Sequence, residues 1–148
     1  MSELSELEQR VVDFLNAKKS SLGLVRVLRG EPMRVETPPC AFVSIQDCVL
    51  ARTDEKYGRM IVTVAIVAFT GPLPEEKARD ATLDLGQKIA VAFLKDPTLK
   101  ASGSPFALNL RIADIKPRII PGSKGESLRS VTVLLEIAVD QIDIEVSW

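Results

Sequence analysis

The feature that most constrains the fold is an unbroken apolar run over residues 60–69, Met-Ile-Val-Thr-Val-Ala-Ile-Val-Ala-Phe. Its β-branched residues favour a strand, and it has about half the length of a membrane-spanning helix. In a strand, Ile61 and Val67 would face one side while Val62 and Val64 face the other, so neither face is polar. A strand of this kind must be covered on both faces. The run therefore predicts a central strand covered by helices of the chain or by another subunit.

A helix is predicted over residues 75–94, after a break at Gly71-Pro72. Two glutamates in its first turn are favourable against the helix dipole, and Pro97 ends it. Gly86 would let the helix approach the sheet closely. We expect this helix to cover one face of the central strand, because its apolar residues follow helical spacing at Ala78, Ala81, Leu85, Ile89, Ala92 and Phe93.

A second helix is predicted over residues 3–18. Ser5 and Glu8 have the spacing of a capping box, and apolar residues then recur every three or four positions. We expect this helix to cover the other face of the sheet. If it lies elsewhere, one face of the central strand becomes a predicted subunit interface.

The central strand has two predicted partners. Residues 40–46 alternate as a strand and form an antiparallel hairpin with it through the polar turn at residues 52–58. Residues 130–139 alternate over a similar length and form a second long strand, the natural neighbour of the first. The chain is thus predicted to contain a mostly antiparallel or mixed sheet.

The remaining segments are less regular. Residues 22–29 read either as a short strand or as irregular chain. Residues 106–115 form a strand in which the nearby Pro117 indicates an edge or a bulge. Glycine and serine make residues 121–127 a flexible loop, and residues 141–148 keep a period of two up to Trp148. We expect Trp148 to pair at a sheet edge or to dock on a partner chain.

Length and composition are those of one globular domain. The 148 residues, 46% hydrophobic and 26% charged, suffice for a core without disulfides. Residues 1–148 are therefore predicted to form a single α+β domain with the sheet packed against two main helices. The formal charge of -1 gives no general electrostatic reason to expect nucleic acid or an anionic membrane as partner.

Several kinds of chemistry are disfavoured. The chain has no histidine, which removes Ser-His-Asp and Cys-His sites, and no metal or cofactor is expected. Cys40 and Cys48 are predicted to be reduced thiols that behave as small hydrophobes. The acidic N-terminus is unlike a signal peptide, so synthesis in a cytoplasm is expected.

The remaining candidates for chemistry have simpler interpretations. Asp140, Asp143 and Glu145 could serve a small enzyme that uses carboxylates and lysines, but a solvated strand face is favoured. The segment Gly122-Ser-Lys-Gly125 lacks the spacing of a phosphate loop and precedes a strand, so nucleotide binding is not predicted. We expect no enzymatic activity.

Basic residues gather at two loops. Arg52, Lys56 and Arg59 surround the first hairpin, and Arg118, Lys124 and Arg129 surround the loop at residues 121–127. They are either ordinary surface charge, or protein-docking loops, or the lining of a channel that carries nucleic acid.

The order of these elements resembles the tail terminator, or tail completion, proteins of long-tailed bacteriophages. The resemblance rests on element order and length: a helix, the strand entered through Pro38-Pro39-Cys40-Ala-Phe-Val43, a charged hairpin, a long apolar strand, a helix ending in Phe93-Leu94-Lys-Asp96, a loop and a final long strand. It implies a small α+β protein that forms a hexameric ring. Such a ring caps the tail tube, stops its polymerisation and binds the head connector.

By this resemblance, the chain is a virion protein of the tail or neck, made in the cytoplasm of a host bacterium. Its partners would be copies of itself, the tube protein and the neck protein, with DNA passing through the ring and no membrane. The two basic loops would contact tube or neck, or face the lumen. The alternative is another neck, baseplate or secretion-system adaptor of similar fold.

Overall fold

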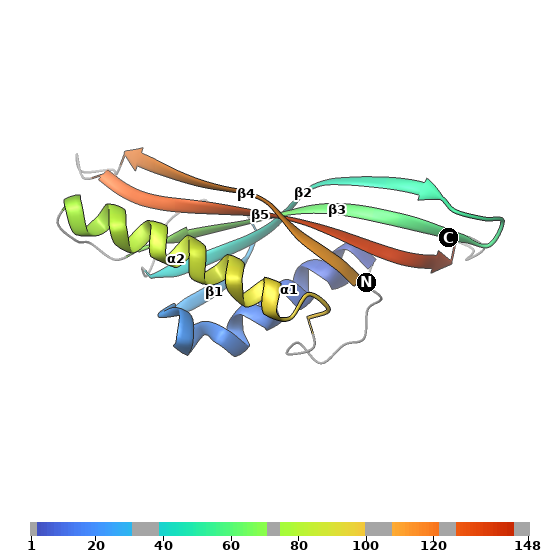
Figure 1. Ribbon diagram of the computed structural model, residues 1–148, viewed down its shortest axis with the longest axis horizontal. Helices are drawn as coiled ribbons and strands as arrows, with labels where there is room; N and C mark the ends of the chain where they lie inside the picture. Colours follow the sequence, from blue (N-terminus) through green and yellow to red (C-terminus); the bar gives the residue numbers. More distant parts are fainter. Residues whose placement is uncertain (1–2, 31–38, 71–74, 100–107, 122–126, 144–148) are drawn as a thin grey trace.

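The structure, a computed structural model, describes residues 3–30, 39–70, 75–99, 108–121 and 127–143. Two helices and five strands follow one another as α1 (Glu3–Leu22), β1 (Arg26–Arg29), β2 (Cys40–Arg52), β3 (Tyr57–Phe69), α2 (Glu75–Lys95), β4 (Leu108–Pro121) and β5 (Ser127–Asp143). They form two layers, a twisted sheet and a helical layer on one of its faces (Figure 1). The predicted fold class, a mixed sheet packed against two helices in one α+β domain, is confirmed.

The sheet has the strand order β1-β2-β3-β5-β4, in which only β1 and β2 are parallel. The long apolar strand β3 is central, and its predicted neighbour β5 pairs with it antiparallel along nearly its whole length. β4 is an edge strand that contains Pro117 and has a register shift between Ile112 and Asp114, in line with the predicted edge or bulge. Residues 22–29 had two interpretations, a short strand or irregular chain. Residues 26–29 form a short strand.

The main core lies between the sheet and the helices. Leu7, Val11 and Leu15 of α1 and Leu85 and Ile89 of α2 are buried in one cluster with the same faces of β3 and β5. Between the helices, the rings of Phe14 and Phe93 lie with their centroids 4.5 Å apart. One continuous core therefore holds both helices and the centre of the sheet.

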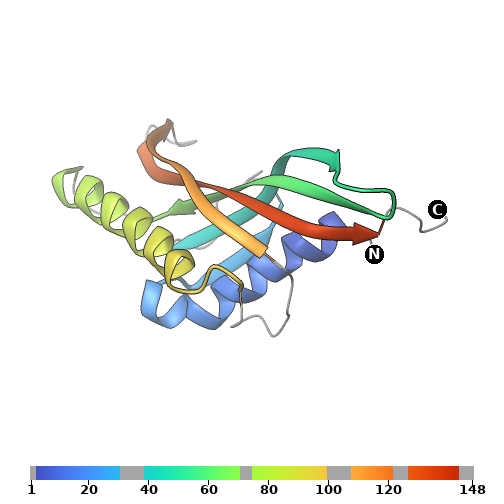
Figure 2. The same cartoon turned by 45° about the vertical axis from the view of Figure 1, so that its right-hand side comes forward.

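Both helices lie on the same face of the sheet, and Figure 2 shows the same layering from a second direction. The prediction that α1 covers the opposite face is therefore wrong. The Phe14–Phe93 contact gives the reason: α1 buries its apolar stripe against α2 as well as against the sheet. No helix of the described residues covers the other face, which we call the open face.

The ends of α1 also differ from the prediction. The helix runs to Leu22 rather than Lys18, and its end is a Schellman motif: Leu24 N donates to Lys19 O at 2.9 Å and Gly23 N to Ser20 O at 3.3 Å. Gly23 has the positive φ of 73° that this ending requires. At the other end, α1 already includes Glu3, so Ser5 is inside the helix and the predicted capping box is wrong.

Glu8 has a tertiary role instead. Its Oε2 accepts a hydrogen bond from the backbone N–H of Ile45 at 3.0 Å, and its Oε1 accepts one from Arg29 Nε at 2.5 Å. These bonds tie α1 to β2 and β1. The carboxylate therefore fixes the position of the helix on the sheet.

At Gly86, α2 lies close to the sheet. A Cβ atom at this position would be 2.6 Å from Val131 Cγ2 of β5. The predicted close approach is confirmed, because no larger residue fits without a shift of the sheet or the helix.

A smaller cluster lies on the open face, at the end of the sheet near residue 40. Cys40, Phe42 and Phe69 are buried there, and the rings of Phe42 and Phe69 make an edge contact with centroids 6.0 Å apart. Cys48 is half-buried against the main core. Both cysteines are thiols packed among apolar side chains, as the sequence predicted.

Candidate interaction surfaces

The strands β2, β3 and β5 extend beyond the helices as an arm, seen at the right-hand end of Figure 1. Its tip is the turn between β2 and β3, where Oδ1 of Asp54 accepts hydrogen bonds from the backbone N–H groups of Lys56 and Tyr57, both at 2.8 Å. The amide of Tyr57 and then that of Lys56 lower the pKa of Asp54 below its usual value. The turn is thus organised by a carboxylate that stays ionised at neutral pH.

The three basic residues named for this hairpin each contact a neighbour. Arg59 Nε donates to Asp140 Oδ1 at 2.6 Å, which joins β3 to β5. Arg52 Nη2 donates to the carbonyl of Glu55 at 3.1 Å, and Lys56 Nζ lies 5.4 Å from the centroid of the Tyr57 ring. They are therefore distributed around the arm, and Arg59 is neutralised by its carboxylate.

Asp140, one of the carboxylates considered for acid–base chemistry, is the partner of Arg59. This placement supports the interpretation of that strand as a solvated polar face. The side chain of Asp143 and the residue Glu145 lie outside the described part of the structure, as do Lys124 and Trp148, so the predictions for them stay predictions.

Arg129 lies beside a cavity of about 470 Å³ between the start of α2 and the β4–β5 pair. Arg79 and Arg118 also line the cavity. The described lining contains three arginines and no carboxylate: Arg79, Thr82, Pro117, Arg118, Ile119, Arg129 and Ser130. The sequence had grouped Arg118 with Arg129, but it gave no sign that Arg79 of α2 would join them, because that contact depends on helix placement.

A larger cavity of about 680 Å³ lies between the C-terminal ends of α1 and α2. Lys18, Lys88 and Lys95 line it together with Asp84 and Asp96. Charges of both signs therefore surround this space, which favours neither a cationic nor an anionic ligand.

The open face of the sheet has an apolar centre. Val49 of β2, Ile61 of β3 and Ala138 of β5 are direct neighbours in register and form a row across three strands. Val67 and Leu134 lie further along β3 and β5. Ile61, Val67, Leu134 and Ala138 are half-buried, and Val49 is 55% exposed. These five residues are called the open-face patch.

Ion pairs lie on the same face as the open-face patch, and Glu136 lies between Leu134 and Ala138 along β5. Arg111 Nη2 of β4 donates to Glu136 Oε2 of β5 at 2.9 Å, and this hydrogen bond lowers the pKa of Glu136 and raises that of Arg111. The Arg59–Asp140 pair lies further along the same face. Arg59, Ile61, Arg111 and Glu136 line one shallow cavity of about 180 Å³, which places the pairs beside the apolar row.

A second exposed apolar surface lies on α2. Leu83, Val91 and Leu94 are 40%, 38% and 56% exposed, and their spacing of eight and three residues puts them on one side of the helix. They are called the α2 stripe. The sequence analysis placed Ala78, Ala81, Leu85, Ile89, Ala92 and Phe93 on the core-facing side of this helix and did not identify the stripe. The signal was present, because these three residues do not fit the core-facing spacing.

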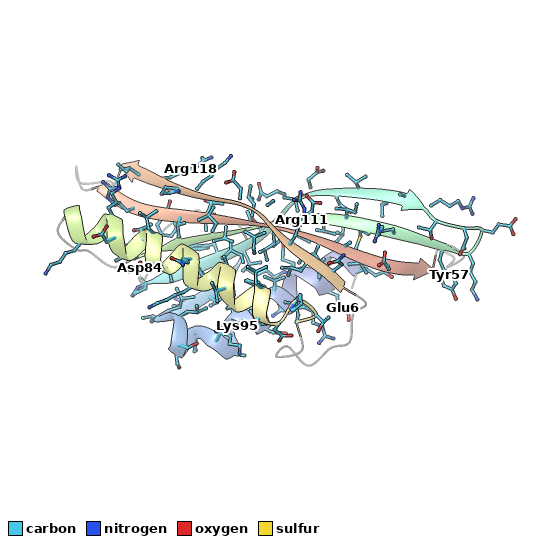
Figure 3. All side chains as sticks on the ribbon, in the orientation of Figure 1. Glu6, Tyr57, Asp84, Lys95, Arg111 and Arg118 are labelled. Atoms are coloured by element: carbon cyan, nitrogen blue, oxygen red, sulfur yellow. The ribbon has the colours of Figure 1, made fainter. Side chains whose placement is uncertain are left out.

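The arm exposes apolar residues on both of its faces. Leu50 is 73% exposed and belongs, by its register with Met60, to the helix-bearing side of the sheet, whereas Val49 belongs to the open face. Neither described helix reaches far enough to cover Leu50. Figure 3 shows Tyr57 near the tip of this arm, Arg111 and Arg118 along β4, and Asp84 and Lys95 along α2.

The described residues contain no group of three or more histidine, cysteine, aspartate or glutamate side chains that could hold a metal ion. In the same part of the chain, neither helix has the length and apolar character needed to cross a membrane.

Comparison with known proteins shows likeness at the level of the fold. No family model and no curated protein matches the chain. One solved structure that it resembles is titled "Virion of native gene transfer agent (GTA) particle". The matched chain has a TM-score of 0.56 and 17% sequence identity, and the match covers 95% of this chain and 99% of that one. This chain therefore shares its fold, over nearly the whole length of both, with a chain of that particle.

Proposed function

We propose that this chain is a structural protein of a phage-like virion. The observation that carries the proposal is the shared fold with a chain of the gene transfer agent particle, which spans 95% of this chain and 99% of the other. A match of two whole chains indicates a complete common module rather than a recurring pair of elements. The order of elements in the sequence independently resembles tail terminator proteins.

Within that class, the proposed role is a tail terminator. Copies of the chain form a closed ring, a hexamer, that caps the tail tube, ends its polymerisation and gives the neck protein its docking surface. The exposed surfaces support this role. The open-face patch, the α2 stripe and the two-sided arm are apolar surfaces of the kind that neighbouring subunits cover in an assembly.

The proposed role is structural rather than enzymatic. Asp140 is bound by Arg59 and Glu136 by Arg111, each across neighbouring strands. Carboxylates held in this way stabilise a sheet surface through cross-strand pairs, and the hydrogen bond from Arg111 lowers the pKa of Glu136.

The loops have proposed roles that follow from the resemblance to tail terminators. The arm tip with Arg52 and Lys56, the β4–β5 end with Arg129, and Lys124 contact the tube or the neck or face the lumen through which DNA passes. Trp148 docks on a partner chain. The protein is made in the host cytoplasm and resides in the virion.

Electron microscopy of particles made without this chain tests the role. The proposal expects tails that are overlong or ragged and that carry no heads, since nothing would stop tube growth or bind the neck. Restoring the chain should restore tail length. Tails of normal length in its absence would contradict the terminator role and favour another neck, baseplate or secretion-system adaptor.

Stoichiometry is tested separately. Native mass spectrometry of the chain, alone and with assembled tube protein, should detect six copies at tube ends. A protein that never binds tube ends would refute the capping role.

A further inference from the structure

The outer edge of β2 is free along the arm. β2 pairs with β3 on one side, but on its other side it pairs with β1 only at Cys40–Val43. Figure 1 shows β2 as an outer strand of the arm. We propose that residues 48–52, which we call the arm edge, pair antiparallel with the arm edge of a second copy, about a two-fold axis at Leu50.

The backbone of the arm edge offers peptide groups that β3 does not bind. Thr53 N donates to Tyr57 O at 3.1 Å, so this residue pair is hydrogen-bonded. Along an antiparallel ladder, such pairs alternate with pairs whose N–H and C=O groups point away from the partner strand. The register of β2 with β3 therefore turns the peptide groups of Cys48, Leu50 and Arg52 toward the free edge.

Carboxylates already bind the outward amides that come earlier in β2. Ile45 N donates to Glu8 Oε2 at 3.0 Å, and Cys48 N donates to Asp47 Oδ1 at 2.9 Å. The donors that remain for an incoming strand therefore begin after Cys48.

These donors match a two-fold register. Leu50 N–H donates to the Leu50 carbonyl of the second copy and the reverse bond forms by symmetry, while Arg52 N–H donates to the Cys48 carbonyl at each end. Cys48 N–H keeps its bond to Asp47. The pairing thus uses the free donors without breaking a hydrogen bond of the single chain.

The same register places apolar side chains opposite one another. Leu50 lies opposite Leu50 of the second copy on the helix-bearing side, and Val49 lies opposite Ala51 on the open-face side. Leu50 and Val49 are 73% and 55% exposed in the single chain. Side chains directly opposite in an antiparallel pair are in contact, so the pairing removes apolar surface from water on both faces of the arm.

Neighbouring registers are less favourable. A shift of the axis to Val49 sets Ala51 opposite Asp47, and a shift to Ala51 sets Leu50 opposite Arg52. Either shift puts an apolar side chain against a charged one. The register centred on Leu50 is therefore preferred.

The outer strand at the other side of the sheet is protected from such pairing. β4 contains Lys116, Pro117 and Arg118 in succession, and lysine and proline are features by which natural edge strands avoid pairing. Residues 48–51 are Cys-Val-Leu-Ala and contain neither a charge nor a proline. The arm edge therefore favours a second arm edge over β4 as its partner.

A two-fold contact uses the same surface on both copies and closes at two copies. The dimer is therefore a state of the free chain that is separate from the proposed ring. Neither proposal depends on the other.

Opposite charges at the axis test the contact. Leu50→Lys and Leu50→Glu each place like charges directly opposite one another in the dimer, which is unfavourable. Each variant alone should lose at least about tenfold in dimer affinity. An equal mixture should restore the dimer as a heterodimer, with lysine opposite glutamate. Ile119→Lys is the control, because Ile119 is 55% exposed and lies on β4, the other outer strand.

Self-association is measured by native mass spectrometry and light scattering up to roughly 1 mM, with circular dichroism to verify folding. Wild type and Ile119→Lys should form dimers alike, while each Leu50 variant alone should stay monomeric. Wild type that remains monomeric over this range overturns the proposal, as does an Ile119→Lys variant that loses the dimer. A mixture of the Leu50 variants that does not dimerise shows that position 50 does not face itself, and this also overturns it.

Disulfide cross-linking tests the register without charges, and it decides the case if a Leu50 variant does not fold. In a Cys48→Ala background, Val49→Cys and Ala51→Cys are oxidised separately and as a mixture. Opposite residues of a non-hydrogen-bonded pair have Cα atoms about 4.5 Å apart, within the range of a disulfide. Cys40 is 1% exposed in the chain, so it does not compete.

The mixture should form a linked heterodimer at least about tenfold faster than either variant forms a homodimer, because each cysteine is roughly 7–8 Å from its own counterpart on the diagonal. Equal rates in all three samples would show that residues 49 and 51 do not face each other, and the proposal would be overturned.

Discussion

Substituting Gly86 by alanine sets two opposing effects against each other. In a helix interior, alanine is favoured over glycine by about 0.8–1.0 kcal/mol. The added methyl, however, would lie 2.6 Å from Val131 Cγ2 and 3.3 Å from Ile115 Cγ2. Because carbon atoms in contact are about 3.5–4.0 Å apart, Val131 or α2 must move by roughly 1 Å.

Val131 has little freedom to move. It is 0% exposed, its side chain is β-branched, and its strand is paired on one side with Ala68 of β3 and on the other with Pro117 of β4. Overpacking at such a site costs about 1–3 kcal/mol. We therefore expect Gly86→Ala to lower the free energy of unfolding by about 1 kcal/mol, which corresponds to roughly 2–4 °C in Tm for a domain of this size.

The measurement is urea unfolding followed by circular dichroism, at concentrations where the protein is monomeric. The difference between Gln87→Gly and Gln87→Ala, at the next and exposed position, gives the helix-propensity contribution without any clash. A Val131→Ala background removes the 2.6 Å contact and leaves only the 3.3 Å contact with Ile115 Cγ2, so Gly86→Ala should now raise the free energy of unfolding, by up to about 1 kcal/mol.

The change of sign is the critical result. Should Gly86→Ala stabilise the wild-type protein as much as the Gln87 pair predicts, the close approach of α2 to β5 would not constrain this position, and the packing argument would fail.

Three further predictions concern single contacts. Glu8→Ala leaves the Ile45 amide without its acceptor and should lower the free energy of unfolding by about 1.5–3 kcal/mol. Arg29→Ala keeps that hydrogen bond and should lower it by under about 1 kcal/mol. Equal losses in urea unfolding would contradict the conclusion that Glu8 fixes α1 on the sheet. Gly23→Ala should cost about 1 kcal/mol because an L-residue is strained at a φ of 73°, although nothing lies within 4 Å of the new methyl; an unchanged Tm would refute the Schellman ending. Burial and then the charge of Asp47 raise the pKa of Cys48, so its thiolate is scarce at pH 8. Asp47→Asn should lower that pKa and speed alkylation of Cys48 at pH 8, and a rate independent of Asp47 would show that the carboxylate has no influence there.

Ion pairing of Glu136 gives the sheet surface a defined dependence on pH. Because Arg111 lowers the folded pKa of this carboxyl, its contribution to stability is present above the ordinary pKa of glutamate and disappears as the pH falls through the lowered value. The pair is exposed, so its contribution is screened by salt.

Much of the fold follows from local patterns in the sequence. The apolar run at residues 60–69 can only be a central strand, because it has no polar face to turn toward water. Its pairing with residues 130–139 follows from matching length and alternation, and Pro117 indicates an edge because proline lacks the N–H that a central ladder requires. The absence of histidine removes the common catalytic triads at the level of composition alone.

The candidate interaction surfaces could be predicted only in part from local patterns in the sequence. The sequence located the basic residues of the hairpin, but it did not indicate that Arg59 would be neutralised by Asp140, a residue 81 positions away in the chain. The sequence also did not indicate that Arg79 would line the same cavity as Arg118 and Arg129, because that arrangement depends on how α2 lies on the sheet.

The sequence by itself determined that the central strand needs cover on two faces and that two amphipathic helices are present to provide it. Only the tertiary structure decided that both helices cover the same face. Periodicity specifies which side of a helix is apolar but not what that side packs against. Here Phe14 meets Phe93 and Glu8 binds β1 and β2, so α1 lies beside α2 and the other face of the sheet stays open.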